Sequence, residues 1–367
     1  MAMGIESLSR AASGLFDPPL KRSYRRATLL PDTWARRAVL LALVALLVVA
    51  PVVSDYYKLA IAIAIGIGVI GGVATNLLVG IAGQASIGNA AFMAIGAFTA
   101  AQLGGYEHWP FLAALLAGGV AAGIVGVLVA IPAMRVRGLY LIIATLALHY
   151  VSIYALTRFQ AVRVGDAGFL MPRVVIGPLT NVQTWYCIIT LCAALSIIVL
   201  RNLIRTRYGR AWAAIARDEV GAAVLGVRVR REKIKVFSLT SVIIGIQGAL
   251  FGYYVGVVSI DPFTFDLAVS FIAMIVIGGL GSAGGTILGA FFVVGLPYAL
   301  TSLSQQLPTS LAALLTARLF DLETIVYGLA IVIFLVWERR GLIHAWHRLA
   351  SGFATWPLAR PIKASDG

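Results

Sequence analysis

Long apolar runs separated by short polar breaks fill the chain from residue 38 to residue 337. Runs of about 17–25 apolar residues have the length of a helix that crosses a bilayer. A lipid-facing barrel would instead show strict alternation of apolar and polar positions, which this chain lacks. The pattern predicts about ten membrane helices. They are residues 38–54, 59–80, 86–103, 111–133, 138–157, 184–200, 234–257, 266–280, 283–303 and 322–337.

Two of these segments, 86–103 and 266–280, are short for a complete span and rich in Gly, Ala and Ser. They are predicted to be broken or re-entrant helices, which lipid tolerates only when protein surrounds them. Other spans carry glycines four residues apart, a spacing that places both on one helix face and allows close helix contact. These pairs are Gly68 and Gly72, Gly119 and Gly123, Gly248 and Gly252, and Gly285 and Gly289.

The composition agrees with a membrane protein. Of the 367 residues, 60% are hydrophobic and 12% are charged, with a mean hydropathy of +0.94. Soluble domains carry about 25% charged residues, so lipid must surround most of this chain. The net charge of +14 does not indicate nucleic-acid binding, because the Lys and Arg residues flank apolar segments, where they set membrane orientation.

The basic stretches predict the topology and the domain organisation. They are a tail at 1–37, a turn with Arg135 and Arg137, a loop at 201–235 and a tail at 338–367. Counting spans from a cytoplasmic N-terminus places all four in the cytoplasm, as the positive-inside rule requires. We therefore expect a permease domain at 38–337 between two cytoplasmic tails. The first apolar run follows a long basic tail, so no cleavable signal peptide is expected.

The acidic residues exclude several function classes. None of the 15 lies in the middle of a predicted span, whereas ion-coupled transporters use intramembrane carboxylates. A stand-alone secondary transporter or channel is therefore disfavoured. An enzyme is also disfavoured, because only His344 and His347 lie close together, on a basic tail that suits a membrane surface. Cys187 and Cys192 share one apolar run and are interpreted as buried thiols, so no metal site is expected.

The loop at 201–235 is the most charged part of the chain. It holds ten basic and three acidic residues, so its net charge of +7 is half of the total. Its pattern predicts two short helices, at about 209–216 and 219–225. Without an ATP-binding motif of its own, a transporter of this kind needs an external energy source, and such a helix pair suits docking of another protein. The alternative is a surface helix pair held by anionic membrane lipid.

Single residues support this interpretation of the loop. Trp212 and Ile215, three positions apart, are expected to be the buried side of the first helix. Asp218 can cap the second helix by accepting from a backbone N–H group, and Gly226 suits the left-handed position that ends it. The three residues between the helices are expected to stay exposed. They are Arg217, Asp218 and Glu219.

Three stretches of the sequence resemble segments of one protein family, and they occur in the same order as in that family. "YGRAWAAIARDEVGAAVLGVRVRREKIKVFSLTSVIIGIQGALFG" resembles the coupling loop, and the helix after it, of LivM-type permeases of ABC transporters for branched-chain amino acids. "GQASIGNAAFMAIGAFTAA" and "FIAMIVIGGLGSAGGTILGAFFVVGLP" resemble two further signatures of that family, over about residues 40–340 in all. The resemblance implies an all-α type II importer fold in which the loop after the sixth helix contacts an ATPase.

The resemblance also implies partners and a place in the cell. The chain is expected in the bacterial inner membrane, without a cofactor of its own and without nucleic acid. Expected partners are a LivH-type second permease, two ATP-binding subunits of LivG and LivF type that hold ATP and Mg, and an extracytoplasmic binding protein. The expected cargo is a branched-chain or related amino acid. Aromatic or carboxylic compounds, or urea and amides, are alternatives.

Candidate residues follow from these patterns. Polar uncharged groups in a broken helix can hydrogen-bond a passing solute, or they can bond neighbouring helices instead. His149 lies in "ATLALHY", where the family commonly has "VTLGFGE", so it is either a pathway residue or a packed histidine. The pathway candidates are Gly83, Gln84, Ser86, Asn89, His149 and Gln247. The coupling candidates are Gly209, Arg210, Trp212, Ile215, Arg217, Asp218, Glu219, Ala222, Ala223 and Gly226.

Overall fold

A computed structural model describes residues 51, 55–133, 139–174 and 181–304, with a few later positions (325, 328, 329, 332 and 341–343). The chain divides into two compact units, Met1–Leu59 and Ala60–Gly367. In the first unit, the described residues are Pro51, Asp55 and residues 56–59, which are the first four of a long helix. The expected spans at 38–54 and 322–337, and both tails, lie almost wholly outside the described residues.

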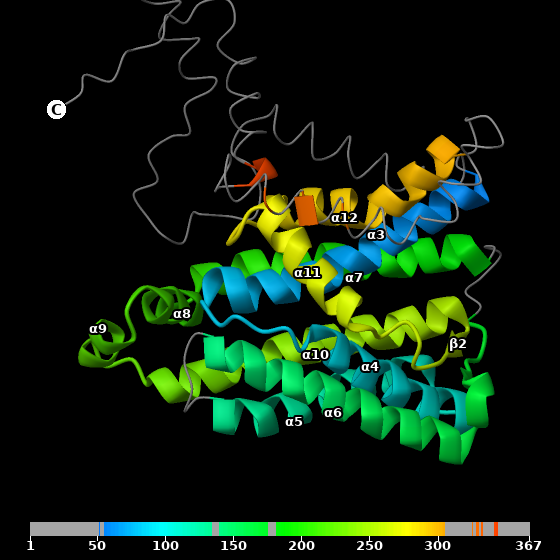
Figure 1. The fold of residues 1–367 in the computed structure, drawn as a ribbon, viewed down its shortest axis with the longest axis horizontal. Coiled ribbons are helices and arrows are strands. Elements are labelled where there is room, and N and C mark those ends of the chain that lie inside the picture. Colours follow the sequence, from blue (N-terminus) through cyan, green and yellow to red (C-terminus); the bar gives the residue numbers. More distant parts are fainter. Residues whose placement is uncertain are drawn as a thin grey trace, which may run out of the picture. The chain divides into compact units, whose positions relative to one another are not determined.

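The described chain is almost entirely helical (Figure 1). Two α-helices continue directly into π-helical turns, labelled η2 and η3. The elements are α3 (Tyr56–Thr75), η2 (Asn76–Ile81), α4 (Asn89–Ala100), η3 (Ala101–Tyr106), α5 (Phe111–Ala133), α6 (Leu139–Arg163), η4 (Gly165–Ala167), β1 (Phe169–Leu170), α7 (Asn181–Arg205), α8 (Arg207–Arg217), α9 (Glu219–Val224), α10 (Val229–Val255), β2 (Val257–Val258), α11 (Phe265–Gly278) and α12 (Ala283–Ser304).

Within the described residues, five helices are long and apolar enough to cross a membrane. They are α3 with η2, α5, α6, α7 and α10, and the shorter apolar helices are α11 and the first part of α12. Each predicted span that falls on described residues is a helix here. The chain is therefore an all-α, multi-pass membrane protein, the fold class that its hydrophobic pattern predicts.

The predicted interruptions are also present. Residues 83–88 are not helical, and α4 begins only at Asn89 before running into η3. Helix α11 has 14 residues, which is about 21 Å at 1.5 Å per residue and shorter than the roughly 30 Å of bilayer hydrocarbon. Figure 1 shows α11 and α12 meeting at a tight turn.

Helix α4 lies at the centre of one group of helices. It packs against α5, α6 and α10, and α10 also packs along α5. Ten of the twelve residues of α4 are buried, so it is enclosed by protein. This enclosure explains how an interrupted, small-residue helix is tolerated at membrane depth.

The glycine pairs lie at helix contacts, as their spacing predicts. A Cβ atom on Gly119 or Gly123 would meet side chains of α10, and one on Gly68 or Gly72 would meet Met274 of α11. A Cβ on Gly248 would meet the backbone of α4, and one on Gly289 would meet the backbone of α11. Small residues thus allow the backbones to approach where larger ones would separate them.

The two ends of this helix group differ. At one end lie the short helices α8 and α9, and at the other lies the small sheet of β1 and β2 (Figure 1). The strands pair antiparallel, with Phe169 opposite Val258. At the end with the sheet, Gln160 joins α6 to the segment after β2, because its Oε1 accepts from the backbone N–H of Ile260 at 3.0 Å.

Candidate functional site: the coupling helices and the cavities at each end of α4

The joint between α7 and α8 is tight. Thr206 caps α8, its side chain accepting from the backbone N–H of Gly209 at 3.5 Å. A Cβ atom on Gly209 would lie within 2.5 Å of the Cα of Ile204. Only glycine fits this position, so the direction in which α8 leaves the long helix is set by local chemistry.

Asp218 determines the elbow between the two short helices. It ends α8, and its Oδ1 accepts from the backbone N–H of Val220 at 2.9 Å at the start of α9. Gly226 follows α9 with φ of +84°, a conformation that L side chains rarely adopt. The cap and the left-handed glycine that the sequence predicts are both confirmed, and the predicted helix limits are correct to within two residues.

Trp212 and Ile215 anchor the first helix, as their spacing predicts. They are 3% and 4% exposed. The indole Nε1 of Trp212 donates to Oε2 of Glu232 on α10 at 3.2 Å, and the other oxygen of Glu232 pairs with Lys235 at 2.6 Å. Helix α8 is therefore attached to the first turns of α10 by the hydrogen bond from Trp212 to Glu232, and Lys235 pairs with the same carboxylate.

One prediction about the elbow is wrong. Arg217 and Asp218 are exposed as expected, but the carboxylate of Glu219 forms an ion pair with Lys233, and only 27% of its side chain is exposed. Lys233 itself is buried in the first turns of α10. A buried ammonium requires a paired carboxylate, and Glu219 is the one within reach. The pattern of the loop could not show this, because the partner belongs to the next helix.

The remaining coupling candidates divide between the two faces of the pair. Ala222 is buried with Trp212 and Ile215, whereas Ala223 is exposed. Arg210 is exposed, and its guanidinium donates to the backbone oxygen of Arg205 at 3.2 Å. One face of the helix pair thus packs on the protein while the other presents charge and backbone to its surroundings.

Two of the sequence motifs meet at the base of α8. Gly83, in the interrupted segment, has φ of +66°, and a Cβ there would lie 3.0 Å from that of Ala216. Beside this contact is a cavity of ≈ 290 Å³, which we call the junction cavity. It is bordered by Gly83 and Gln84, the elbow residues 217–220 and Lys233. The base of α8 and the interruption before α4 therefore lie in direct contact.

The interrupted segment combines bonded and unbonded polar groups. The hydroxyl of Ser86 accepts from the backbone of Gly88, and the amide of Asn89 donates to Thr75 at 2.9 Å. Gln84 is only 3% exposed, yet neither atom of its amide has a hydrogen-bond partner among the described residues. Asn89 thus connects the segment to α3, whereas Ser86 bonds within the segment, and Gln84 is among the residues that border the junction cavity.

The two remaining pathway candidates are buried farther along the helices. Gln247 is 1% exposed and lies against Gly71 and Phe271, with neither amide atom paired within the described residues. His149 is 2% exposed, and its Nδ1 has no partner there. None of these side chains is accessible in this conformation. Their role in passage stays a prediction.

Asn76 is a structural residue that the sequence patterns missed. It is fully buried, its amide donates to Thr286 at 2.7 Å, and its oxygen accepts from the backbone N–H of Gly281 at 2.7 Å. It joins η2 to the turn between α11 and α12. The sequence feature that could have identified Asn76 is that a single Asn stands within the apolar stretch "VATNLLVG".

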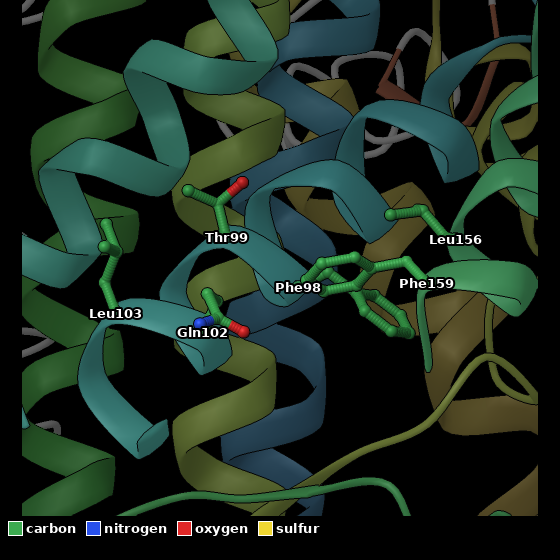
Figure 2. Close-up of a pocket in the computed structure, with 6 residues that line it drawn as sticks. All are labelled: Phe98, Thr99, Gln102, Leu103, Leu156 and Phe159. Atoms are coloured by element: carbon green, nitrogen blue, oxygen red, sulfur yellow. The ribbon is translucent and has the colours of Figure 1, made fainter. Parts of the chain in front are cut away.

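A second cavity, also missed, lies at the opposite end of α4 (Figure 2). It has a volume of ≈ 280 Å³ and mostly apolar walls. Figure 2 shows side chains from α4, η3 and α6 around it. They are Phe98, Thr99, Gln102, Leu103, Leu156 and Phe159. We call it the η3 cavity.

Metal chemistry has no support in the part of the chain that the structure describes. No group of three His, Cys, Asp or Glu side chains there could hold an ion. Cys187 and Cys192 are both unoxidised thiols, and Cys187 is exposed on α7 rather than buried as the sequence pattern suggested. His344 and His347 lie outside the described residues.

Comparisons with known proteins agree on one family. A family model described as the permease component of branched-chain amino acid transport systems matches residues 57–336. The LivM permease protein of the high-affinity branched-chain amino acid transport system of Escherichia coli K12 is 28% identical over 363 residues, covering 92% of this chain and 79% of the relative. The LivM protein of Salmonella typhimurium LT2 is 27% identical over 338 residues, covering 85% and 76%. No solved structure matches.

Proposed function

The chain belongs to the family of permease components of branched-chain amino acid transport systems, and from this premise we propose that it is the membrane subunit of an ATP-driven importer. Members of this family are transport components rather than enzymes, so ATP hydrolysis falls to partner subunits. Helices α8 and α9 are the proposed docking site for a cytoplasmic ATPase. The cytoplasmic location of both termini, and the bacterial inner membrane, are parts of the same proposal.

One observation carries this proposal: the coupling helices are rigidly held on one face and charged on the other. Trp212 and Ile215 fix the pair to α10, while Arg217 and Asp218 are exposed at the elbow. A surface held only by lipid headgroups would not need two caps and a buried indole bond. The contact between Gly83 and Ala216 then gives the docked ATPase a route to the membrane segment before α4.

The proposed mechanism is alternating access. Closure of two ATPase subunits would move α8 and α9, and the junction at Gly83 would pass this movement to α4, around which α5, α6 and α10 pack. A second permease subunit, a second ATPase and an extracytoplasmic binding protein complete the proposed machine. The names of the two relatives support leucine, isoleucine and valine as cargo.

Charge reversal at the elbow tests the docking proposal. We expect Arg217→Glu to reduce ATP-dependent uptake to background and to release the ATPase from the purified complex, because the exposed guanidinium would meet the partner directly. The matched control is Arg173→Glu, the same change at an exposed arginine next to β1. Normal uptake by the Arg217 variant would contradict the docking role.

Purification of the tagged chain from its own host, with partners identified by mass spectrometry, tests the assembly. An ATP-binding subunit and a second permease are the expected partners. Recovery of the chain alone, active in liposomes without ATP, would overturn the proposal in favour of a secondary transporter. Competition of leucine uptake by aromatic, carboxylic and amide compounds would then distinguish the cargo classes.

A further inference from the structure

We propose that a third cavity, between the end of α7 and the turn that joins α11 to α12, binds the headgroup of an anionic phospholipid. The binding itself goes beyond the proposed function. Only its assignment to the cytoplasmic leaflet rests on that function, because the orientation of the chain is part of the same proposal. None of the coupling or pathway candidates borders this cavity.

The cavity lies between a face of one helix and the start of another. Ile197, Arg201 and Ile204 follow along α7 at the i, i+4 and i+7 spacing of a single helix face, and residues 281–284 with Ile287 of α12 form the other wall. We call it the α7–α12 cavity. Its volume of ≈ 570 Å³ falls within the range for ligand sites, about 300–1,000 Å³. The space is therefore large enough for a headgroup and not only for a single ion.

The charge of the α7–α12 cavity is positive. Arg201 and Arg205 both border it, both residues are exposed, and one helical turn separates them by about 6 Å along the axis. Among the described residues that border the cavity, none is acidic. Guanidinium groups form paired hydrogen bonds with phosphate oxygens. Two arginines on successive turns therefore suit a phosphate group.

The other wall adds a smaller attraction for an anion. Helix α12 begins there at Ala283, and the hydroxyl of Ser282 accepts from the backbone N–H of Gly285 at 3.1 Å. The first backbone N–H groups of a helix and its dipole favour a negative charge nearby. This field adds to that of Arg201 and Arg205, which are the main source of attraction.

The surface of α7 identifies lipid, rather than a soluble anion, as the source of the phosphate. Leu191, Leu195 and Ile198 are exposed apolar residues on one side of this membrane span. Leu191, Ile198 and Arg205 recur every seven residues, so this lipid-facing stripe ends at an arginine of the cavity. Basic pockets between membrane helices are typical sites for anionic lipid headgroups. The isoleucines of the cavity would then contact the first methylene groups of the lipid, which a free phosphate would leave uncovered.

The α7–α12 cavity adjoins the start of the coupling helices. Arg205 is the last residue of α7, and its backbone oxygen accepts from the guanidinium of Arg210 on α8 at 3.2 Å. On the other side, Gly281 in the turn donates its backbone N–H to Asn76 of η2 at 2.7 Å. A bound headgroup would therefore connect the end of α7 to the turn before α12, directly beside α8.

Lipid binding to the intact complex tests this site. The full-length chain, purified with its partners in detergent, would be titrated with dioleoyl phosphatidylglycerol or dioleoyl phosphatidylcholine, and the bound lipid counted by native mass spectrometry. We expect the anionic lipid to bind at least about tenfold more tightly. Arg201→Gln with Arg205→Gln should weaken its tightest binding about thirtyfold, since each cation near an anionic headgroup accounts for about fivefold. The matched control is Arg158→Gln with Arg163→Gln, which removes the same charge from exposed positions on α6 and should have no effect.

Two further variants distinguish a built cavity from general surface charge. Ile287→Trp would fill the cavity without changing its charge and should weaken binding of the anionic lipid about tenfold, whereas Leu191→Trp on the lipid-facing stripe should not. Arg201→Lys with Arg205→Lys keeps both charges and should restore most of the affinity that the glutamine variant loses.

Three outcomes would overturn the site. They are equal binding of the two lipids, unchanged binding by the Ile287 variant, and binding that disappears when the ATPase subunits are added, which would assign the cavity to a protein partner. Leucine uptake tests the proposed function separately. A chain that binds the anionic lipid at this cavity but imports nothing would contradict the proposed function alone.

Discussion

The two ends of α4 are fastened by different kinds of contact. Near Asn89, the neighbouring coupling helices are held by charges and hydrogen bonds, with Glu232 joining Trp212 to Lys235 and Glu219 pairing with Lys233. Near Tyr106, aromatic contacts predominate, with Phe169 stacked on Phe159, beside the hydrogen bond between Gln160 and Ile260. Charged contacts are directional, whereas aromatic walls accept a range of apolar shapes.

The contacts at the coupling end fit the role proposed for it. Movement of a docked partner can pass to the membrane helices only through a rigid connection. The connection between α7 and α8 at Thr206 and Gly209 is of this kind. Four predictions address this contrast, from the largest expected effect to the smallest.

Removal of the indole should have the largest effect. Trp212→Ala would leave a cavity under α8 and remove the indole donor to Oε2 of Glu232, whose other oxygen keeps Lys235, a loss of about 4 kcal/mol by comparison with other buried tryptophans. Hydrogen exchange of the amides in 207–224 should rise steeply while that of α5 stays unchanged. Trp109→Ala, at a site 47% exposed, is the control. Retained protection of α8 would mean that charge alone holds the pair.

Loss of the buried ion pair should come next. Glu219→Gln leaves Lys233 buried without a counter-charge, at a cost of about 3 kcal/mol, and ATP-dependent uptake should fall with it. Replacing both residues by Gln and Met removes the stranded charge and should restore the stability of the pair. If the double variant were no more stable than the single one, the pair would not explain the position of α9.

The coupling end could be predicted in much greater detail than the η3 cavity. Helix caps, a glycine that ends a helix and amphipathic spacing depend only on residues close together in the sequence. The structural roles of Asp218, Gly226, Trp212 and Ile215 could therefore be predicted. The ion pair of Glu219 did not follow, because Lys233 lies 14 residues away on another helix. The spans were predictable because apolar length is itself the signal.

The η3 cavity illustrates what sequence patterns omit. Phe98 and Phe159 lie in apolar runs where a phenylalanine is ordinary, and only the packing of α6 beside α4 brings them together. The π-helical turns also leave no mark in the hydrophobic pattern. Gln84, Asn89 and Gln247 are recognisable in the sequence as polar residues within apolar segments. Their hydrogen-bond partners, however, depend on the fold.

A smaller effect is expected at the junction between the two motifs. Gly83→Ala would place a side chain in a left-handed conformation, at about 1–2 kcal/mol, and press it against Ala216. Uptake should fall in part, with the complex still assembled and its ATPase activity less dependent on cargo. Adding Ala216→Gly relieves the contact but not the backbone strain, so only partial recovery is expected. Full activity of the Gly83 variant would show that the interrupted segment before α4 does not transmit movement from α8.

The smallest expected effect lies at the aromatic end, and it tests the contrast most closely. Phe159→Leu keeps the cavity apolar but removes a ring that stacks on Phe169, a contact worth about 1 kcal/mol. The free energy of unfolding of the purified complex should fall by about this amount, and docking of the ATPase should not change. The equivalent change at the coupling end, Trp212→Phe, keeps an aromatic ring but removes the N–H that Glu232 accepts. If that variant were also nearly silent, shape rather than directional bonding would hold α8, and the two ends of α4 would be built alike.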